Sequence, residues 1–302
     1  MGNIASGRQR REGFIVDAFG MMPAVKRMFV CGICMMLLCV AASGALPAAA
    51  EAGHTGTHQA PMRMPSNSSY AVRKNGATID FGNATQGYVM IKHEKTDIKL
   101  RVRISMGATE YTYVLNGQNA FEVFPLQMGS GKYRIQVLSR GVRNYYTAVA
   151  SKTLEVDMAD PNIAYLYPNQ YVNYSESSKA VAKAAELCEG LQTDREKFRA
   201  IYNFCSRRII YNFQLALAPS REHRVDVDKV LAERKGICLD YAVLMACMLR
   251  SQGIPAQVVI GHADGAYHAW NKVLLEGKWY RCDATYAATS GIADVYQEER
   301  HY

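Results

Sequence analysis

The sequence has little tryptophan, little net charge and no apolar run as long as a bilayer is thick. Only 2 of its 302 residues are Trp, against 19 Tyr, and both Trp lie between residues 270 and 279. The formal net charge is +8 with acidic and basic residues interspersed, which does not favour a nucleic-acid partner. Residues 51–302 contain no C-x-x-C, no H-E-x-x-H and no EF-hand-like loop. What remains is a chain with 49% apolar residues, enough for a packed core and long enough for two domains.

The first fifty residues predict a signal peptide behind a polar N-terminal extension. Lys26-Arg27 precede an apolar run from Met28 to about Ala42, and Ala48-Ala49-Ala50 forms a cleavage site. The run is shorter than the roughly 20 residues that span a bilayer, so cleavage is favoured over a membrane anchor. A later start codon would account for the extension. Removing the five Lys/Arg and two Asp/Glu of this segment leaves 30 basic and 25 acidic residues. We therefore expect a secreted or cell-envelope protein. It would be attached to a membrane only where the signal segment stays uncleaved.

The segment after the cleavage site predicts a linker and then an all-β domain. Residues 51–68 are rich in His, Gly, Ser and Pro, and residues 69–158 predict a small Ig-like β-sandwich. Apolar and polar residues alternate in seven short segments separated by turn sequences. These predicted strands are 88–92, 98–104, 111–115, 121–124, 133–138, 145–149 and 153–156. No cluster of catalytic residue types occurs among them, which favours a binding or spacer module.

Helical spacing replaces this alternation, and residues 159–302 predict an α+β domain. The expected helices run over 175–190, from an N-cap at Asp194, over 227–234 and from 239 up to the stop signals Gly253 and Pro255. Residues 209–211 predict a short extended piece and 214–224 a loop. Three strands follow, at 256–260, 268–275 and 278–282.

A cysteine, a histidine and an aspartate follow one another in this domain. Cys238 lies in the first turn of the long helix, where the helix dipole and free N–H groups favour a thiolate. A two-residue or four-residue turn at Glu276-Gly277 pairs residues whose numbers sum to 553, which places His268 and Asp283 on one face as diagonal neighbours. A three-residue turn would place the two side chains on opposite faces. A thiol, a base and a carboxylate are the groups that thiol acyl transfer needs. The backbone N–H of Cys238 is a candidate oxyanion donor.

Other roles compete for the same residues. Taken singly, each of the three fits a packing or turn position. A metal site built from His262, His268, Cys282 and Asp283 is the rival chemistry, and the missing ligand spacings disfavour it, so we predict no metal and no cofactor. An odd count of five cysteines after residue 50 predicts one free thiol, Cys238, and leaves the disulfide state of the other four open.

Four linked motifs resemble the core of the transglutaminase-like superfamily. They are Gly236-x-Cys238-x-Asp240-Tyr241-Ala242, Leu249-Arg250-x-x-Gly253-Ile254-Pro255-Ala256, His268-Ala269-Trp270 and Asp283-Ala284-Thr285-Tyr286, with Gly277-Lys278-Trp279 between the last two. The resemblance implies a papain-like fold in which helices pack on an antiparallel sheet. It implies Cys238 as nucleophile, His268 as base and Asp283 as the residue that orients the base.

The resemblance further implies a secreted bacterial transglutaminase-like cysteine peptidase or acyltransferase. Its expected substrate is an amide bond of a protein or a cell-wall peptide. Whether water or an amine takes the acyl group is left open, as is the second oxyanion donor, for which Tyr202 and Tyr211 are weighed against core packing. The alternative is a non-catalytic envelope binding or scaffold protein with the same domain.

Overall fold

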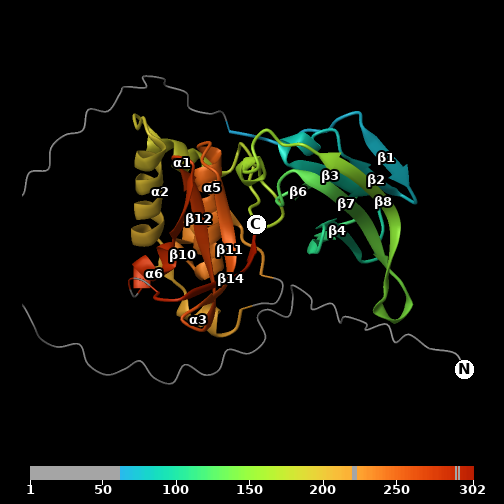
Figure 1. Cartoon of the computed structure of the whole chain (residues 1–302). Helices are drawn as coiled ribbons and strands as arrows, with labels where there is room; N and C mark the ends of the chain where they lie inside the picture. Colours follow the sequence, from blue (N-terminus) through green and yellow to red (C-terminus); the bar gives the residue numbers. More distant parts are fainter. Residues whose placement is uncertain (1–61, 220–222, 290, 292) are drawn as a thin grey trace, which may run out of the picture. The chain divides into compact units, whose positions relative to one another are not determined.

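The order of the elements follows the change of pattern in the sequence, with strands first and then helices and another sheet (Figure 1). The computed structural model describes residues 62–302 except 220–222, 290 and 292. The predicted signal peptide and most of the predicted linker lie outside the described residues. Within the described residues, no helix is both long and apolar enough to cross a membrane.

The first region contains two four-stranded antiparallel sheets, with strand orders β1-β2-β3-β6 and β5-β4-β7-β8. Side chains of both sheets, such as Ile79, Phe124 and Ile135, meet in one hydrophobic core. The strands are β1 (Ala71–Lys74), β2 (Ala77–Asp80), β3 (Tyr88–His93), β4 (Leu100–Met106), β5 (Thr109–Leu115), β6 (Glu122–Pro125), β7 (Gly131–Arg140) and β8 (Tyr146–Val156). Three short 3-10 helices accompany them, η2 (Ala84–Gln86), η3 (Val142–Asn144) and η4 (Ile163–Leu166). The predicted β-rich region is confirmed, whereas its type as an Ig-like sandwich and the domain boundaries stay predictions.

Three details of this region differ from the prediction. The segments 145–149 and 153–156 are one strand, β8, which pairs with β7 through a bulge at Val137/Leu138. Strands β1 and β2 were not predicted. Ile98 lies outside β4 and is 54% exposed, so the buried face of that strand begins at Leu100.

The second region packs helices on a third four-stranded antiparallel sheet, of order β13-β12-β11-β14. Helix α5 lies against β11 and β12, and α1, α2, α4 and α6 contact it from the other sides (Figure 1). The elements are α1 (Lys179–Cys188), α2 (Asp194–Arg208), β9 (Ile210–Tyr211), α3 (Phe213–Leu217), α4 (Val227–Glu233), β10 (Lys235–Gly236), α5 (Cys238–Ser251), β11 (Ala256–Ala263), β12 (Ala266–Leu275), β13 (Lys278–Cys282), α6 (Ala284–Thr289) and β14 (Tyr296–His301). The predicted α+β class with an antiparallel sheet is confirmed.

Local hydrogen bonds explain where the helices begin. Thr193, rather than the predicted Asp194, caps α2, because its side chain accepts the N–H of Glu196 while Glu196 accepts the N–H of Thr193. The predicted loop at 214–224 overlaps α3, which begins because the side chain of Asn212 accepts the N–H of Leu215. Helix α5 is buried on all sides from Asp240 onward, as expected for a helix that is apolar around its whole circumference.

The pairing of β12 with β13 has the predicted register. Asn271 faces Cys282 and Leu275 faces Lys278, so the paired numbers sum to 553. Glu276 and Gly277 both have positive φ, 52° and 74°, as a two-residue hairpin turn requires. Strand β14, which the sequence did not predict, extends the sheet by pairing with β11.

Candidate active site

Cys238 is the first residue of α5, and two neighbours set its position. Asp240 accepts the N–H of Ile237 at 2.8 Å and so caps the helix from inside. Gly236 leaves room for that carboxylate, since a Cβ at this position would lie 2.5 Å from the Cβ of Asp240. The thiol therefore sits at the positive end of the α5 dipole, as predicted.

All five cysteines of the described residues are free, and they differ in exposure. Cys238 is partly exposed, whereas the remaining four are buried. Burial raises the pKa of Cys205 to about 12 and raises the pKa of Cys247 and Cys282 as well. Among the described thiols, Cys238 is thus the one that a solute can reach.

His268 and Asp283 form a buried pair. The Nε2–H of His268 donates to Oδ2 of Asp283 at 2.7 Å, and the two residues are only 8% and 9% exposed. Cys238 is close enough to His268 for its charge to act on the pKa of the imidazole. Burial lowers the pKa of His268, but the hydrogen bond to Asp283 and the charges of Asp283 and Cys238 outweigh it and raise this pKa to about 9. The structure thus brings together the three predicted residues, and their catalytic roles stay predictions.

The carboxylate of Asp283 is held by four donors. Oδ1 accepts the N–H groups of Thr285 and Tyr286, both at 3.0 Å, at the start of α6. Oδ2 accepts the hydroxyl of Tyr296 at 2.9 Å besides the ring of His268. Because the two backbone donors fix Oδ1, Oδ2 is directed at the imidazole. Tyr296 lies on the unpredicted strand β14, and its segment Tyr-Gln-Glu-Glu-Arg-His lacks the alternation that would have indicated a strand.

Asn271 fixes the helix that carries the thiol against the strand that carries the base. Its Nδ2 donates to the carbonyl of Ala242 on α5 at 2.9 Å and to that of Gln257 on β11 at 3.0 Å. Ala242 lies one helical turn after Cys238, and Asn271 lies three residues after His268. Sequence reasoning missed this role, although an amide within a buried strand requires such partners.

Tyr211 lies beside the segment that leads to the thiol, since it pairs with Gly236, two residues before Cys238. Burial raises the pKa of Tyr211, and the negative charge of Cys238 raises it further. The Tyr286 ring meets His268 edge-on, with centroids 5.0 Å apart. Tyr202 instead donates to the backbone oxygen of Asp283 at 3.3 Å. Of the two tyrosines considered from the sequence, Tyr211 is the one beside the thiol.

The four residues of the rival metal site do not converge. His262 pairs with Glu299 at 3.1 Å, and Sγ of Cys282 faces the carbonyl of Asn271 at 3.7 Å. In the part of the chain that the structure describes, no three His, Cys, Asp or Glu side chains gather as ligands. Of the four candidate metal ligands, His268 and Asp283 are the two that are hydrogen-bonded to each other.

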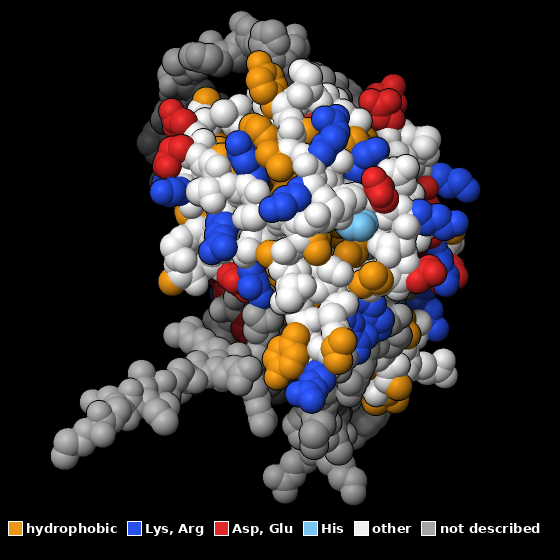
Figure 2. All heavy atoms as spheres, turned by 90° about the vertical axis from the view of Figure 1, so that its right-hand side faces the viewer, with side chains coloured by type: hydrophobic (Ala, Val, Ile, Leu, Met, Phe, Trp, Pro, Cys, Tyr) orange, Lys and Arg blue, Asp and Glu red, His pale blue; other side chains and the backbone are white. Residues whose placement is uncertain are grey.

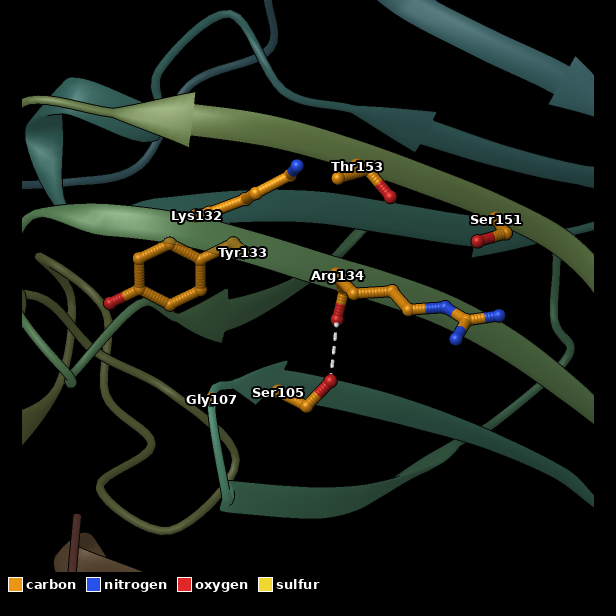
Figure 3. A pocket seen from close by; sticks show the side chains of 7 residues that line it. All are labelled: Ser105, Gly107, Lys132, Tyr133, Arg134, Ser151 and Thr153. Atoms are coloured by element: carbon orange, nitrogen blue, oxygen red, sulfur yellow. Dashed lines mark hydrogen bonds between the residues drawn. The ribbon is translucent and has the colours of Figure 1, made fainter.

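The β-rich region has a cavity of its own, of about 540 Å³, over β4, β7 and β8 (Figure 3). Lys132, Arg134, Ser105, Ser151 and Thr153 line it, and the hydroxyl of Ser105 donates to the carbonyl of Arg134. Lys and Arg side chains are spread over this side of the molecule rather than gathered in one patch (Figure 2). The lining contains no thiol, imidazole or carboxylate, so the candidate chemistry lies at Cys238.

A thiol at a helix start, facing a histidine–carboxylate pair on an antiparallel sheet, defines a papain-like thiol domain. The family model of the transglutaminase-like superfamily matches residues 181–284, which include all three residues. Residues 181–284 therefore form a transglutaminase-like domain.

Known proteins resemble parts of the chain. Human kyphoscoliosis peptidase is 29% identical over 156 residues, which are 48% of this chain and 23% of that protein. The mouse protein is 31% identical over 123 residues, or 37% and 18%. The match thus spans less than a quarter of the length of these curated relatives.

Solved structures resemble it more distantly. A provisionally assigned cysteine protease from Cytophaga hutchinsonii is 17% identical, covers 78% of this chain and 82% of its own, and has a TM-score of 0.37. The periplasmic domain of TgpA from Pseudomonas aeruginosa is 16% identical, covers 72% and 73%, and has a TM-score of 0.33.

Proposed function

We propose that Cys238, His268 and Asp283 form the catalytic triad of an enzyme that transfers the acyl group of an amide. The observation that carries the proposal is the 2.7 Å hydrogen bond between His268 and the buried carboxylate of Asp283, together with a partly exposed thiol whose charge acts on the same imidazole. Nε2 of His268 is bound to Asp283, so Nδ1 is left to exchange a proton with the thiol. The raised pKa of His268 favours the ion pair of thiolate and imidazolium.

The proposed reaction has two steps. The thiolate attacks the amide carbon, and the backbone N–H of Cys238 donates to the oxyanion, with the hydroxyl of Tyr211 as a second candidate donor. The imidazolium of His268 gives its proton to the departing nitrogen, the C–N bond breaks and a thioester remains. Water, losing a proton to His268, then attacks the thioester. The carbon–sulfur bond breaks, the acid leaves and Cys238 is regenerated as a thiolate.

We further propose that the protein is exported by a bacterium and hydrolyses amide bonds of proteins or cell-wall peptides. The charged and apolar pattern of the first fifty residues supports export. A lysine amine in place of water would give a crosslink by the same two steps, so acceptor access separates the two outcomes.

The test uses casein and a fluorescent amine. The purified protein is expected to release new amino termini, to incorporate the amine, or both. Cys238→Ser abolishes either signal, and Cys247→Ser is the matched control because that thiol is buried away from solvent. A wild-type protein that gives neither signal, and whose Cys238 reacts with iodoacetamide at pH 6 no faster than free cysteine, would be a binding or scaffold protein.

A further inference from the structure

A second histidine–carboxylate pair lies beside the thiol, and we infer that His223 and Asp240 are positioning residues that hold the start of α5 and offset a buried negative charge next to Cys238. The inference rests on the proposed function, since its effect is measured on the nucleophile. His223 lies in the segment between α3 and α4, outside the motifs that drew attention to Cys238.

The geometry of the pair links three segments. Asp240 is 3% exposed, and its two oxygens have different partners. Oδ2 accepts the N–H of Ile237, the residue before the thiol, and Oδ1 accepts Nε2–H of His223 at 2.8 Å. The carboxylate thereby ties the segment that follows α3 to the first turn of α5. A capping side chain alone needs one oxygen, so the second oxygen is available for a partner from elsewhere in the chain.

The pair also affects the electrostatic environment of the thiol. Asp240 lies two residues after Cys238 in the first turn of α5, so the carboxylate and the thiol share one end of the helix. A buried carboxylate near a thiolate opposes its formation. A protonated His223 offsets that carboxylate, and the hydrogen bond that the ring donates to Asp240 raises the pKa of His223, which favours the protonated form. The other charged group that acts on His223 is Lys229 of α4, whose charge lowers the same pKa.

The arrangement also explains why glycine precedes the thiol by two residues. A side chain at Gly236 would displace Asp240, whose Oδ2 would lie 3.0 Å from its Cβ. Displacing Asp240 would break the hydrogen bonds that its carboxylate accepts from the N–H of Ile237 and from the ring of His223. Gly236, Cys238 and Asp240 therefore act together.

The test measures alkylation of Cys238 by iodoacetamide against pH in the full chain. His223→Gln keeps an N–H donor and removes the charge. It is expected to slow alkylation at pH 6 by about three-fold to ten-fold, because the carboxylate of Asp240, left without its positive partner, disfavours a second negative charge on the sulfur of Cys238. Above the raised pKa of His223 the wild-type ring is neutral as well, so the two rates should agree there. His93→Gln is the matched control, since that ring lies on β3 and hydrogen-bonds the backbone oxygen of Glu94 rather than a carboxylate.

Asp240→Asn completes the test. It removes the negative charge, so alkylation at pH 6 should be as fast as in the wild type or faster, and His223→Gln added to it should cause no further change. Three results would each overturn the inference. The first is an unchanged alkylation rate in His223→Gln, and the second is an equal slowing when His223→Gln is added to Asp240→Asn. The third is slower alkylation in Asp240→Asn than in the wild type. If His223→Gln does not fold, the Asp240→Asn rate alone decides. A wild-type Cys238 no more reactive than free cysteine refutes the proposed function itself, which is a different result.

Discussion

Replacing Asp283 with Asn would test how the carboxylate acts on His268. The amide oxygen would face the N–H groups of Thr285 and Tyr286, because those two donors require an acceptor. The amide NH2 would then face Nε2 of His268, and two donors cannot bond each other. The ring would have to carry its proton on Nδ1, where it could no longer accept the proton of Cys238. The substitution thus preserves shape and removes the base.

The magnitudes follow from the environment of the pair. The pKa of His268 is about 9 against an ordinary value of 6.5, although burial alone would lower it. Each pKa unit corresponds to about 1.4 kcal/mol, so Asp283 and Cys238 together favour the imidazolium by about 3 kcal/mol net. Loss of the charged hydrogen bond at a site under 10% exposed should cost about 2 kcal/mol of stability, or about 5 °C in Tm. Loss of the correct tautomer should lower kcat by about 10² to 10⁴.

The assays are amide turnover and thermal unfolding, run side by side. Glu299→Gln is the matched control, because Glu299 also pairs with a histidine, His262, but with side chains 48% and 36% exposed. That surface pair should contribute less than about 1 kcal/mol. An Asp283→Asn protein that turns over within three-fold of the wild type, or that loses no more stability than the control, would refute the reasoning.

Three further outcomes are expected. The turnover rate should fall as pH rises through about 9, where His268 loses its proton. This raised pKa also stabilises the fold fully below about pH 6.5 and no longer above pH 9, which unfolding at graded pH would reveal. Tyr211→Phe should lower kcat/KM by about ten-fold to a hundred-fold if its hydroxyl donates to the oxyanion, with Tyr70→Phe, at an exposed position, as the control. Iodoacetamide followed by peptide mapping of the described cysteines should label Cys238 in the native protein and the buried four only after unfolding.

Local patterns predicted the parts of the site that depend on neighbours in sequence. The place of Cys238 followed from an apolar helix that begins just after Gly236, and the pairing of β12 with β13 followed from a turn whose two residues accept positive φ. One residue more or fewer in that turn would have moved Asp283 to the other face of the sheet. The turn at Glu276 and Gly277 is therefore why two residues fifteen apart could be paired from the sequence.

The remaining contacts of the site join residues far apart in the chain, and no local sequence pattern predicts them. Tyr296 reaches Asp283 only because β14 pairs with β11, and His223 reaches Asp240 from a segment whose sequence predicts a loop. The error at Asp194 has a different origin. Thr193 and Asp194 are both good capping residues, and Glu196, three residues after Thr193, decides between them by completing a reciprocal pair.

The two acidic residues of the site share one structural task, which joins chemistry to folding. Asp240 bonds the N–H of Ile237 at the start of α5, and Asp283 bonds the N–H of Thr285 at the start of α6. Helix starts leave such donors unsatisfied, so a carboxylate is held there whether or not it has a further partner. In each case the second oxygen faces a histidine, His223 or His268. Changing either aspartate should therefore cost stability at a helix start, whereas changing either histidine leaves the helix start capped and acts mainly on the thiol.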